Sequence, residues 1–168
     1  MAQPSSVETD VLVELQDSFR KAMANVAAPV SVVTTHAGGR PYGTTVSAFA
    51  SLSMSPPMLL ISLQDGSHLL SLLSVGVRLG VNVLAASQTD VATRFAARHE
   101  DKFAGVDWVL EDGAPSLPDS HAWVALKVAR LVPAGDHVLV LGDVVRAVSR
   151  DDHPLTYHRR SFGTHRAH

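Results

Sequence analysis

The 168-residue chain has the size and composition of one globular domain, with 46% hydrophobic and 18% charged residues. Its 14 Lys and Arg and 16 Asp and Glu give a formal net charge of -2, and no basic block exceeds Arg159-Arg160, so we expect no nucleic-acid partner. The absence of cysteine excludes disulfides, thiolate nucleophiles and Cys-based zinc sites, and it fits a reducing compartment. Without a signal-peptide pattern or a run of about 18 apolar residues, the expected location is the cytoplasm, with no membrane association.

The first predicted element is a helix. We expect residues 1–8 to be disordered and residues 9–168 to form a single domain. Thr9 or Asp10 suits an N-cap, and five apolar residues then recur at steps of three or four, as on one face of a helix: Leu12, Leu15, Phe19, Met23 and Val26. Pro29 ends this helix, and a strand over residues 30–36 leads to a glycine-rich turn at residues 38–41.

Residues 42–66 are predicted to form a hairpin with one polar side. Over residues 42–53 small hydroxyl residues alternate with apolar ones, which is typical of a strand whose side chains point alternately to two faces. The polar face would carry Thr45, Ser47, Phe49, Ser51 and Ser53, and the core face Thr44, Val46, Ala48, Ala50 and Leu52. Pro56-Pro57 cannot donate ladder hydrogen bonds, so it separates this strand from an apolar strand at residues 58–63.

The rest of the chain predicts further strands with two short helices between them. Ser67 suits the N-cap of a helix through Val75, a buried strand follows at residues 78–84, and Thr89 or Asp90 can cap a helix through His99. Residues 100–118 form a loop with a short strand at 108–110, and residues 121–133 and 137–148 form a hairpin around the turn at 133–136. Strands with short turns and no βαβ alternation favour an antiparallel barrel with peripheral helices.

Several common functional motifs are missing. The chain has no Gly-x-Gly-x-x-Gly, no Gly-x-x-x-x-Gly-Lys and no Gly-x-Ser-x-Gly run. Of its nine histidines, His153 with His158 and His165 with His168 lie close in sequence but lack a third convergent ligand, so we expect no metal site. The row of hydroxyls at residues 42–53 suits a flat polar heterocycle with a phosphate tail, although a merely solvent-facing strand side has the same pattern.

Four segments carry a resemblance to a known family. They are Phe19 to Thr34, the run from Gly43 to Ser53 with Pro56-Pro57, the run Gly80-Val81-Asn82-Val83-Leu84 followed by Phe95-Ala96 and by Asp101 to Gly105, and the run Ala134-Gly135-Asp136-His137 leading to Gly142-Asp143-Val144. The sequence resembles the short-chain flavin reductases, the NAD(P)H:flavin oxidoreductases that supply reduced flavin to two-component monooxygenases. The likeness spans roughly residues 17–163.

The resemblance implies a mainly β fold with peripheral helices, a split β-barrel of antiparallel Greek-key type. It also implies binding of FMN or FAD near a homodimer interface, with NADH or NADPH as the hydride donor and a separate oxygenase component as the recipient of reduced flavin. Two alternatives remain open at this point: a non-enzymatic flavin- or haem-binding split-barrel module, and an enzyme similar to pyridoxamine-phosphate oxidases.

The resemblance also implies the site residues. The isoalloxazine ring and ribityl chain would contact Thr44, Thr45, Val46, Ser47, Ala48 and Ser51, and the ring and phosphate would approach Leu63, Gln64, Asp65 and Ser67. Further cofactor contacts would come from Asn82, Lys102 and Phe103. Tyr157, in the aromatic and basic tail, would cover the flavin or nicotinamide, the alternative being a contact with the other copy of the dimer. After Ser67 the family often carries hydroxyl residues, whereas this chain has His68, a candidate replacement for the phosphate contact. His137 is the predicted catalytic residue on the nicotinamide side, the alternative being a strand histidine that only bonds the turn at Gly135.

Overall fold

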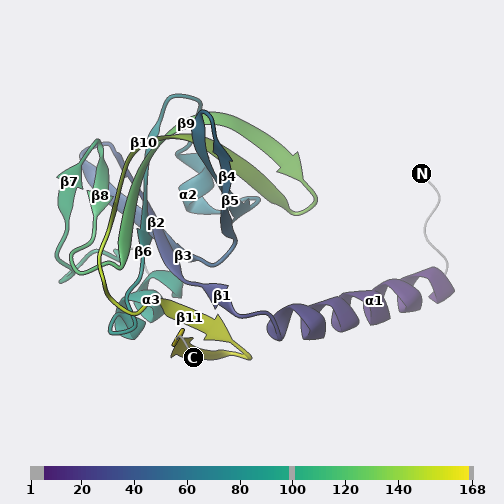
Figure 1. Cartoon of the computed structure of the whole chain (residues 1–168). Coiled ribbons are helices and arrows are strands. Elements are labelled where there is room, and N and C mark those ends of the chain that lie inside the picture. Colours follow the sequence, from purple (N-terminus) through teal and green to yellow (C-terminus); the bar gives the residue numbers. More distant parts are fainter. Residues whose placement is uncertain (1–5, 99–100, 167–168) are drawn as a thin grey trace.

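The computed structural model describes residues 6–98 and 101–166, and its first element is a long helix. α1 (Ser6–Ala24) has 19 residues and projects away from the rest of the molecule (Figure 1). Its first residue, Ser6, lies before the predicted caps Thr9 and Asp10 and within the segment 1–8 that the sequence predicts to be disordered. Residues 1–5 lie outside the described part. No helix within the described ranges is long and apolar enough to cross a membrane.

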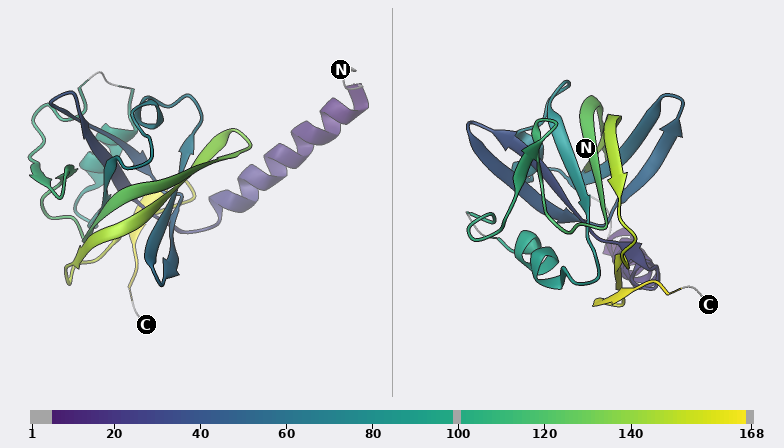
Figure 2. Two further views of the ribbon diagram at one scale, coloured as in Figure 1. Left: turned by 90° about the horizontal axis from the view of Figure 1, so that it is seen from above. Right: turned by 60° about the vertical axis from the view of Figure 1, so that its left-hand side comes forward.

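The centre of the molecule is a seven-stranded antiparallel sheet that curls into a barrel (Figures 1 and 2). Its strands lie in the order β3 (Arg40–Val46), β2 (Ser31–Ala37), β6 (Arg78–Val83), β9 (Ala122–Ala134), β10 (His137–Ser149), β5 (Pro57–Gln64) and β4 (Phe49–Met54). The longest pairing is the β9–β10 hairpin, which the sequence predicted. The mainly antiparallel β fold with few helices confirms the predicted fold class.

The prediction of one continuous strand over residues 42–53 is wrong. β3 ends at Val46 and β4 begins at Phe49, and the two strands lie at opposite ends of the sheet order. Ser47 and Ala48 cross between them, and the carbonyl of Ala48 accepts a hydrogen bond from the Ser62 amide at 2.8 Å. Residues of β3 pair at one end of the sheet order and residues of β4 at the other, so the side chains of the two strands do not follow one alternation. The single polar face therefore does not form.

The burial of the side chains reflects this break between β3 and β4. Val46 is buried, as predicted, but Phe49 packs against the barrel core although it was assigned to the polar face. Leu52, assigned to the core, is 44% exposed and sits at a bulge of β4.

The helices differ from prediction in their lengths. α2 (His68–Ser71) is a single turn and does not reach Val75, although Ser67 caps it as expected, its hydroxyl accepting from the Leu70 amide at 3.4 Å. α3 (Thr89–Ala96) has Gln88 at its N-cap, one residue before the predicted caps. The predicted end of this helix, His99, lies outside the described residues.

Two short sheets complete the fold. The loop before the long hairpin contains β7 (Val109–Glu111) and β8 (Ala114–Ser116). The tail, for which no strand was predicted, forms β11 (Leu155–His158) and β12 (Ser161–Thr164), and β1 (Ala28–Pro29) pairs with β11. This small sheet ties the two ends of the described chain together beside the base of α1.

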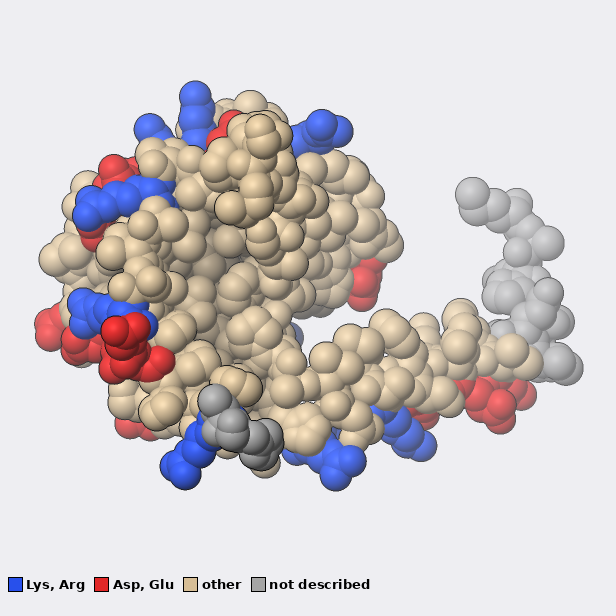
Figure 3. All heavy atoms as spheres, viewed as in Figure 1, with Lys and Arg blue, Asp and Glu red and all other residues tan. Residues whose placement is uncertain are grey.

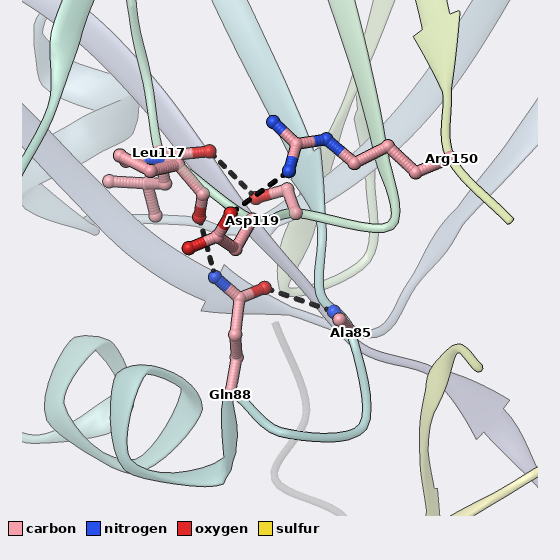
Figure 4. A network of polar contacts seen from close by, with 7 residues as sticks. Ala85, Gln88, Leu117, Asp119 and Arg150 are labelled. Atoms are coloured by element: carbon pink, nitrogen blue, oxygen red, sulfur yellow. Dashed lines mark hydrogen bonds and ion pairs between the residues drawn. The ribbon is translucent and has the colours of Figure 1, made fainter. Parts of the chain in front are cut away.

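The apolar residues form two main cores. One fills the barrel and includes Val33, Ile61, Leu79, Leu126 and Val140, and the other lies under α3 and includes Val32, Leu84, Phe95, Phe103 and Leu155. A polar network fixes the start of α3 (Figure 4): the Gln88 side chain accepts from the Ala85 amide and donates to the Pro118 carbonyl, each at 2.9 Å. α3 is thereby held in register with the barrel, and its far end reaches the cleft described next.

Candidate active site

A cleft of about 720 Å³ opens at one end of the barrel. One wall is the start of β3, from Arg40 to Thr44, together with the turn between β5 and α2, from Gln64 to Leu69. The other wall is residues 96–98 after α3, residues 101–104 and Trp108. The volume lies within the range of about 300–1,000 Å³ that is usual for small-molecule and cofactor sites.

The first wall is built from tight turns. The Asp65 carboxylate accepts from the Gly66 amide at 2.9 Å, and Gly66 has a φ of 75°, which a residue with a side chain rarely adopts. The His68 ring meets the Tyr42 ring edge-on, with 5.3 Å between the ring centroids. The turn at Gly66 and an aromatic pair therefore shape this wall.

The second wall is held by hydrogen bonds from a side chain of α3 to main-chain carbonyls of the wall and by hydrogen bonds within the wall. Arg94 donates from Nε to the Lys102 carbonyl at 2.9 Å and from its terminal nitrogen to the Ala104 carbonyl. The Asp101 carboxylate accepts from the amides of Phe103 and Ala104 at 3.0 and 3.1 Å. These contacts fold residues 101–104 into a compact turn, with Phe103 packed edge-on against Phe95 at 4.9 Å.

The cleft carries more positive than negative side chains. Arg40, Arg98 and Lys102 line it, against the carboxylates of Asp65 and Asp101, and both carboxylates are already bonded to backbone amides. Partial burial lowers the pKa of Lys102, whose ammonium donates to the Phe95 carbonyl at 2.7 Å. Such a lining favours an anionic ligand, because phosphate oxygens accept from guanidinium and ammonium donors.

Six of the residues predicted to bind cofactor line this cleft: Thr44, Gln64, Asp65, Ser67, Lys102 and Phe103. They come from β3, from the β5–α2 turn and from the segment after α3, so the fold brings together residues up to 59 positions apart in sequence (Phe103 and Thr44). Their contact with a flavin stays a prediction, now with a common location.

Four predicted residues lie within the packed structure. Val46 and Leu63 are buried in the barrel core. The Thr45 hydroxyl donates to the Ala92 carbonyl of α3 at 2.7 Å. Asn82 is fully buried, and it donates to the Val32 carbonyl at 3.1 Å and accepts from the Leu117 amide at 2.7 Å. The structure therefore places these four side chains in the fold and does not bring them to the cleft.

Four more lie on the surface outside the cleft lining. Ser47 and Ala48 are exposed at the crossing from β3 to β4, and Ser51 is exposed on β4. Tyr157 is 38% exposed on the small C-terminal sheet, where its ring packs against Phe162 with 5.2 Å between centroids.

His137 lies beside the cleft at the start of β10. It pairs across the sheet with Gln64, and the amide of Asp65 donates to the Asp136 carbonyl at 2.9 Å. Its Nδ1 lies 2.7 Å from the Asp136 carboxylate, and its side chain is 42% exposed. The hydrogen bond from His137, and secondly its charge, hold the pKa of Asp136 below the ordinary 3.8. The observed contact of His137 is with Asp136 in the turn, and its contact with a nicotinamide stays a prediction.

Sequence reasoning missed several cleft residues. The cations Arg40 and Arg98 and the aromatic residues Tyr42 and Trp108 line the cleft but follow no periodic pattern. The run from Asp101 to Gly105 was a usable signal, since it belongs to the resemblance and supplies half of one wall. Within the described ranges, no three His, Asp or Glu side chains are grouped to hold a metal ion.

The fold and the cleft define a split-barrel protein with a nucleotide-sized ligand site. A family model described as "Flavin reductase like domain" matches residues 23–166, and the chain belongs to this family. The match confirms the resemblance inferred from the four sequence segments.

Two individual relatives support this family assignment. The chain is 34% identical over 151 residues to the "NADH:FMN oxidoreductase" of Rhodococcus erythropolis, covering 86% of this chain and 79% of the relative. It is 37% identical over 151 residues to a "Probable flavin reductase" of Rhizobium meliloti, covering 89% of this chain but only 49% of the relative, so it spans about half the length of that protein.

A solved structure matches closely as well. The NADH:FAD oxidoreductase SgcE6 of Streptomyces globisporus, in complex with NAD and FAD fragments, superposes with a TM-score of 0.82 at 30% identity, covering 88% of this chain and 91% of that chain. A second structure of SgcE6 covers 99% of this chain and 98% of that chain with a TM-score of 0.84 at 27% identity, so the matched region includes α1.

Proposed function

We propose that this protein is an NAD(P)H:flavin oxidoreductase that reduces FMN or FAD in the cleft and releases the reduced flavin to a separate monooxygenase component. One observation carries the proposal. The chain belongs to the flavin reductase-like family, and its cleft is lined by cations and by six of the residues that the resemblance implies as flavin contacts.

The residues present fit a flavin nucleotide. Thr44, Gln64 and Ser67 offer donors and acceptors to the ring and ribityl chain, and Phe103 supplies an apolar contact. Lys102, with Arg40 and Arg98 near it in the lining, suits the phosphate. Since β3 ends the sheet, one edge of its backbone is unpaired by any described strand, and Thr44, which lines the cleft, would be placed to donate to the ring.

The protein's part in the reaction is to bind and orient. A bound flavin supplies the redox chemistry, accepting a hydride directly from the nicotinamide ring. The chain has to stack the two rings in reach of each other, and holding reactants in position can supply much of the rate enhancement. Amide donors on the Thr44 to Ser47 segment would stabilise negative charge that develops on the reduced ring. His137, beside the Gln64–Asp65 wall, is assigned to the nicotinamide side.

The proposed functional unit is a homodimer, as the resemblance implies. In this proposal, reduced flavin leaves the cleft as a product. An open cleft whose polar groups come from turns and side chains suits such a release better than a closed cavity would.

The test is an assay of the purified chain with NADH or NADPH and with FMN or FAD. We expect loss of the nicotinamide absorbance band that depends on both flavin and protein. Flavin binding without nicotinamide oxidation would replace the proposal by a non-enzymatic flavin-binding module, and absence of both would reject the site.

A further inference from the structure

The cleft wall contains one lysine with surroundings unlike those of the other two in the chain. The three lysines are Lys21, Lys102 and Lys127. Lys21 is exposed on α1 and Lys127 is exposed on β9, and both lie outside the cleft lining. Lys102 lines the cleft and is half-buried. The chain therefore offers an internal comparison between one amine in a ligand site and two amines on the open surface.

The surroundings of Lys102 favour a reactive amine. Its Nζ donates to the Phe95 carbonyl near the end of α3 at 2.7 Å. Partial burial lowers the pKa of Lys102, so more of this side chain is a neutral amine near neutral pH than for a lysine in water. The neutral amine, and not the ammonium, is the nucleophile. It can keep one N–H on the carbonyl while its lone pair remains available to an electrophile.

The cations beside Lys102 are available to an anionic group. Over β7 and β8 in Figure 3, blue and red side chains lie next to one another, and Arg146 forms an ion pair with Glu111 of β7 at 2.8 Å. In the cleft, by contrast, no carboxylate of residues 6–98 and 101–166 lies within ion-pair distance of Arg40, Arg98 or Lys102. Guanidinium groups in this state suit phosphate oxygens.

We propose that Lys102 is a site of acylation by acyl phosphates, and that its acylation lowers the affinity of the cleft for phosphorylated flavins. An acyl phosphate combines the two features that this site selects, because it carries a phosphate for Arg40 and Arg98 and a carbonyl carbon for the amine. The guanidinium groups themselves stay protonated and do not react.

The reaction is a simple acyl transfer. The Nζ lone pair attacks the carbonyl carbon of the acyl phosphate, and a C–N bond forms. The C–O bond to the phosphate then breaks, inorganic phosphate leaves with the bonding electrons, and Nζ loses a proton to water. The product is a neutral amide on Lys102. No atom changes its oxidation state, so the step needs neither an oxidant nor a reductant.

Acylation removes one of the three cations that line the cleft. An acylated lysine no longer carries a charge and no longer forms a charge-assisted hydrogen bond to phosphate. This consequence rests on the proposed function, in which Lys102 suits the flavin phosphate, whereas the acylation itself depends only on the cleft. An acyl phosphate and FMN would compete for the same amine, and flavin reduction would fall as Lys102 becomes modified.

The first experiment measures where the chain reacts. The full chain is incubated with acetyl phosphate, and acetylation of each lysine is followed by peptide mass spectrometry. We expect Lys102 to react at least about tenfold faster than Lys21 and Lys127, because cations in a cleft concentrate an anionic reagent. The double variant Arg40→Gln with Arg98→Gln should lose most of this preference. Equal rates at the three lysines, or a double variant that keeps the full preference, would overturn the proposal.

The second experiment measures what the modification does. FMN and riboflavin, which lacks the phosphate, are titrated by flavin fluorescence into the acetylated protein and into the variants Lys102→Gln and Lys127→Gln. We expect acetylation and Lys102→Gln to weaken FMN binding about tenfold, the effect of losing a hydrogen bond to a charged group, and to leave riboflavin binding unchanged. Lys127→Gln should bind both flavins as the wild type does. Unchanged FMN affinity, or an equal loss for riboflavin, would contradict the proposed effect on phosphate binding.

Flavin-dependent NADH oxidation by the unmodified wild type separates this inference from the proposed function. If the three lysines react equally while NADH oxidation is intact, the inference fails and the proposed function stands. If Lys102 reacts selectively while NADH oxidation is absent, the acylation site stands and the proposed function fails.

Discussion

His137 shows how one side chain is held beside the cleft by a neighbour in sequence. Its Nδ1 lies 2.7 Å from the Asp136 carboxylate, and the main chain of Asp136 bonds Asp65 in the cleft wall. A histidine so placed is oriented by the turn whether or not it touches the nicotinamide. The sequence named the residue, and the structure shows what positions it.

The variant His137→Ala tests both the proposed contact with the nicotinamide and the observed contact with Asp136. If His137 contacts the nicotinamide, we expect hydride transfer to FMN in anaerobic stopped flow to slow about tenfold, the effect of losing one hydrogen bond to a polar ligand. The pKa of Asp136 should also rise toward 3.8, because the histidine is the main cause of its lowering. An NMR titration of the Asp136 carboxyl measures that change.

The sign of the pH effect follows from the direction of the shift. A carboxyl whose folded-state pKa is lowered adds stability above its unfolded value of 3.8, and this stability is lost as the pH falls through the lowered folded value. The matched control is His153→Ala, an exposed histidine outside the cleft lining. If His137→Ala shifts the Asp136 pKa but leaves flavin reduction unchanged, the histidine serves the turn alone.

Among the elements, the barrel depends on the close approach of β6 and β9 at Gly80. A Cβ at this position would lie 2.0 Å from the Trp123 ring and 2.7 Å from the Thr34 hydroxyl. Trp123 therefore packs over the glycine, and both neighbours belong to strands that have little room to move.

The variant Gly80→Ala should lower the free energy of unfolding by about 3 kcal/mol or more, because the added methyl forces the Trp123 ring or the strands apart. Urea unfolding followed by tryptophan fluorescence measures it. Gly163→Ala is the control, since its Cβ would meet nothing closer than 3.6 Å and should change stability by less than about 1 kcal/mol. Equal stability of the two variants would mean that the barrel repacks around Gly80 at little cost.

At the scale of the whole molecule, the cleft exists only in the folded chain. Its walls come from β3, the β5–α2 turn, the end of α3 and the segment through Trp108, which meet only when the barrel closes. A ligand of this cleft therefore binds the native state and not the unfolded chain.

FMN should accordingly raise the thermal midpoint of the protein. At a concentration about 100 times its dissociation constant, binding adds about 2.7 kcal/mol of stability. For a domain of this size that corresponds to a rise of roughly 5–11 °C in differential scanning fluorimetry or calorimetry. A midpoint that does not move at an FMN concentration that saturates turnover would contradict binding in this cleft.

Much of this protein could be anticipated from local sequence patterns. The stripe from Leu12 to Met23 predicted α1, the β-branched and apolar runs predicted most barrel strands, and the Ala-Gly-Asp-His run marked the turn beside the cleft. These features arise from side-chain spacing and turn chemistry within a few residues, so they can be read without the fold.

Only the tertiary structure decided where the chain breaks and what meets at the site. The alternation over residues 42–53 continues through Ser47 and Ala48, and nothing local shows that β3 and β4 belong to opposite edges of the sheet. Likewise, Asn82 became a buried structural residue while Arg40 and Trp108 came to the cleft, because closure of the barrel sets which distant segments touch. Hydrogen bonds between distant strands determine these contacts, and a one-dimensional pattern does not record them.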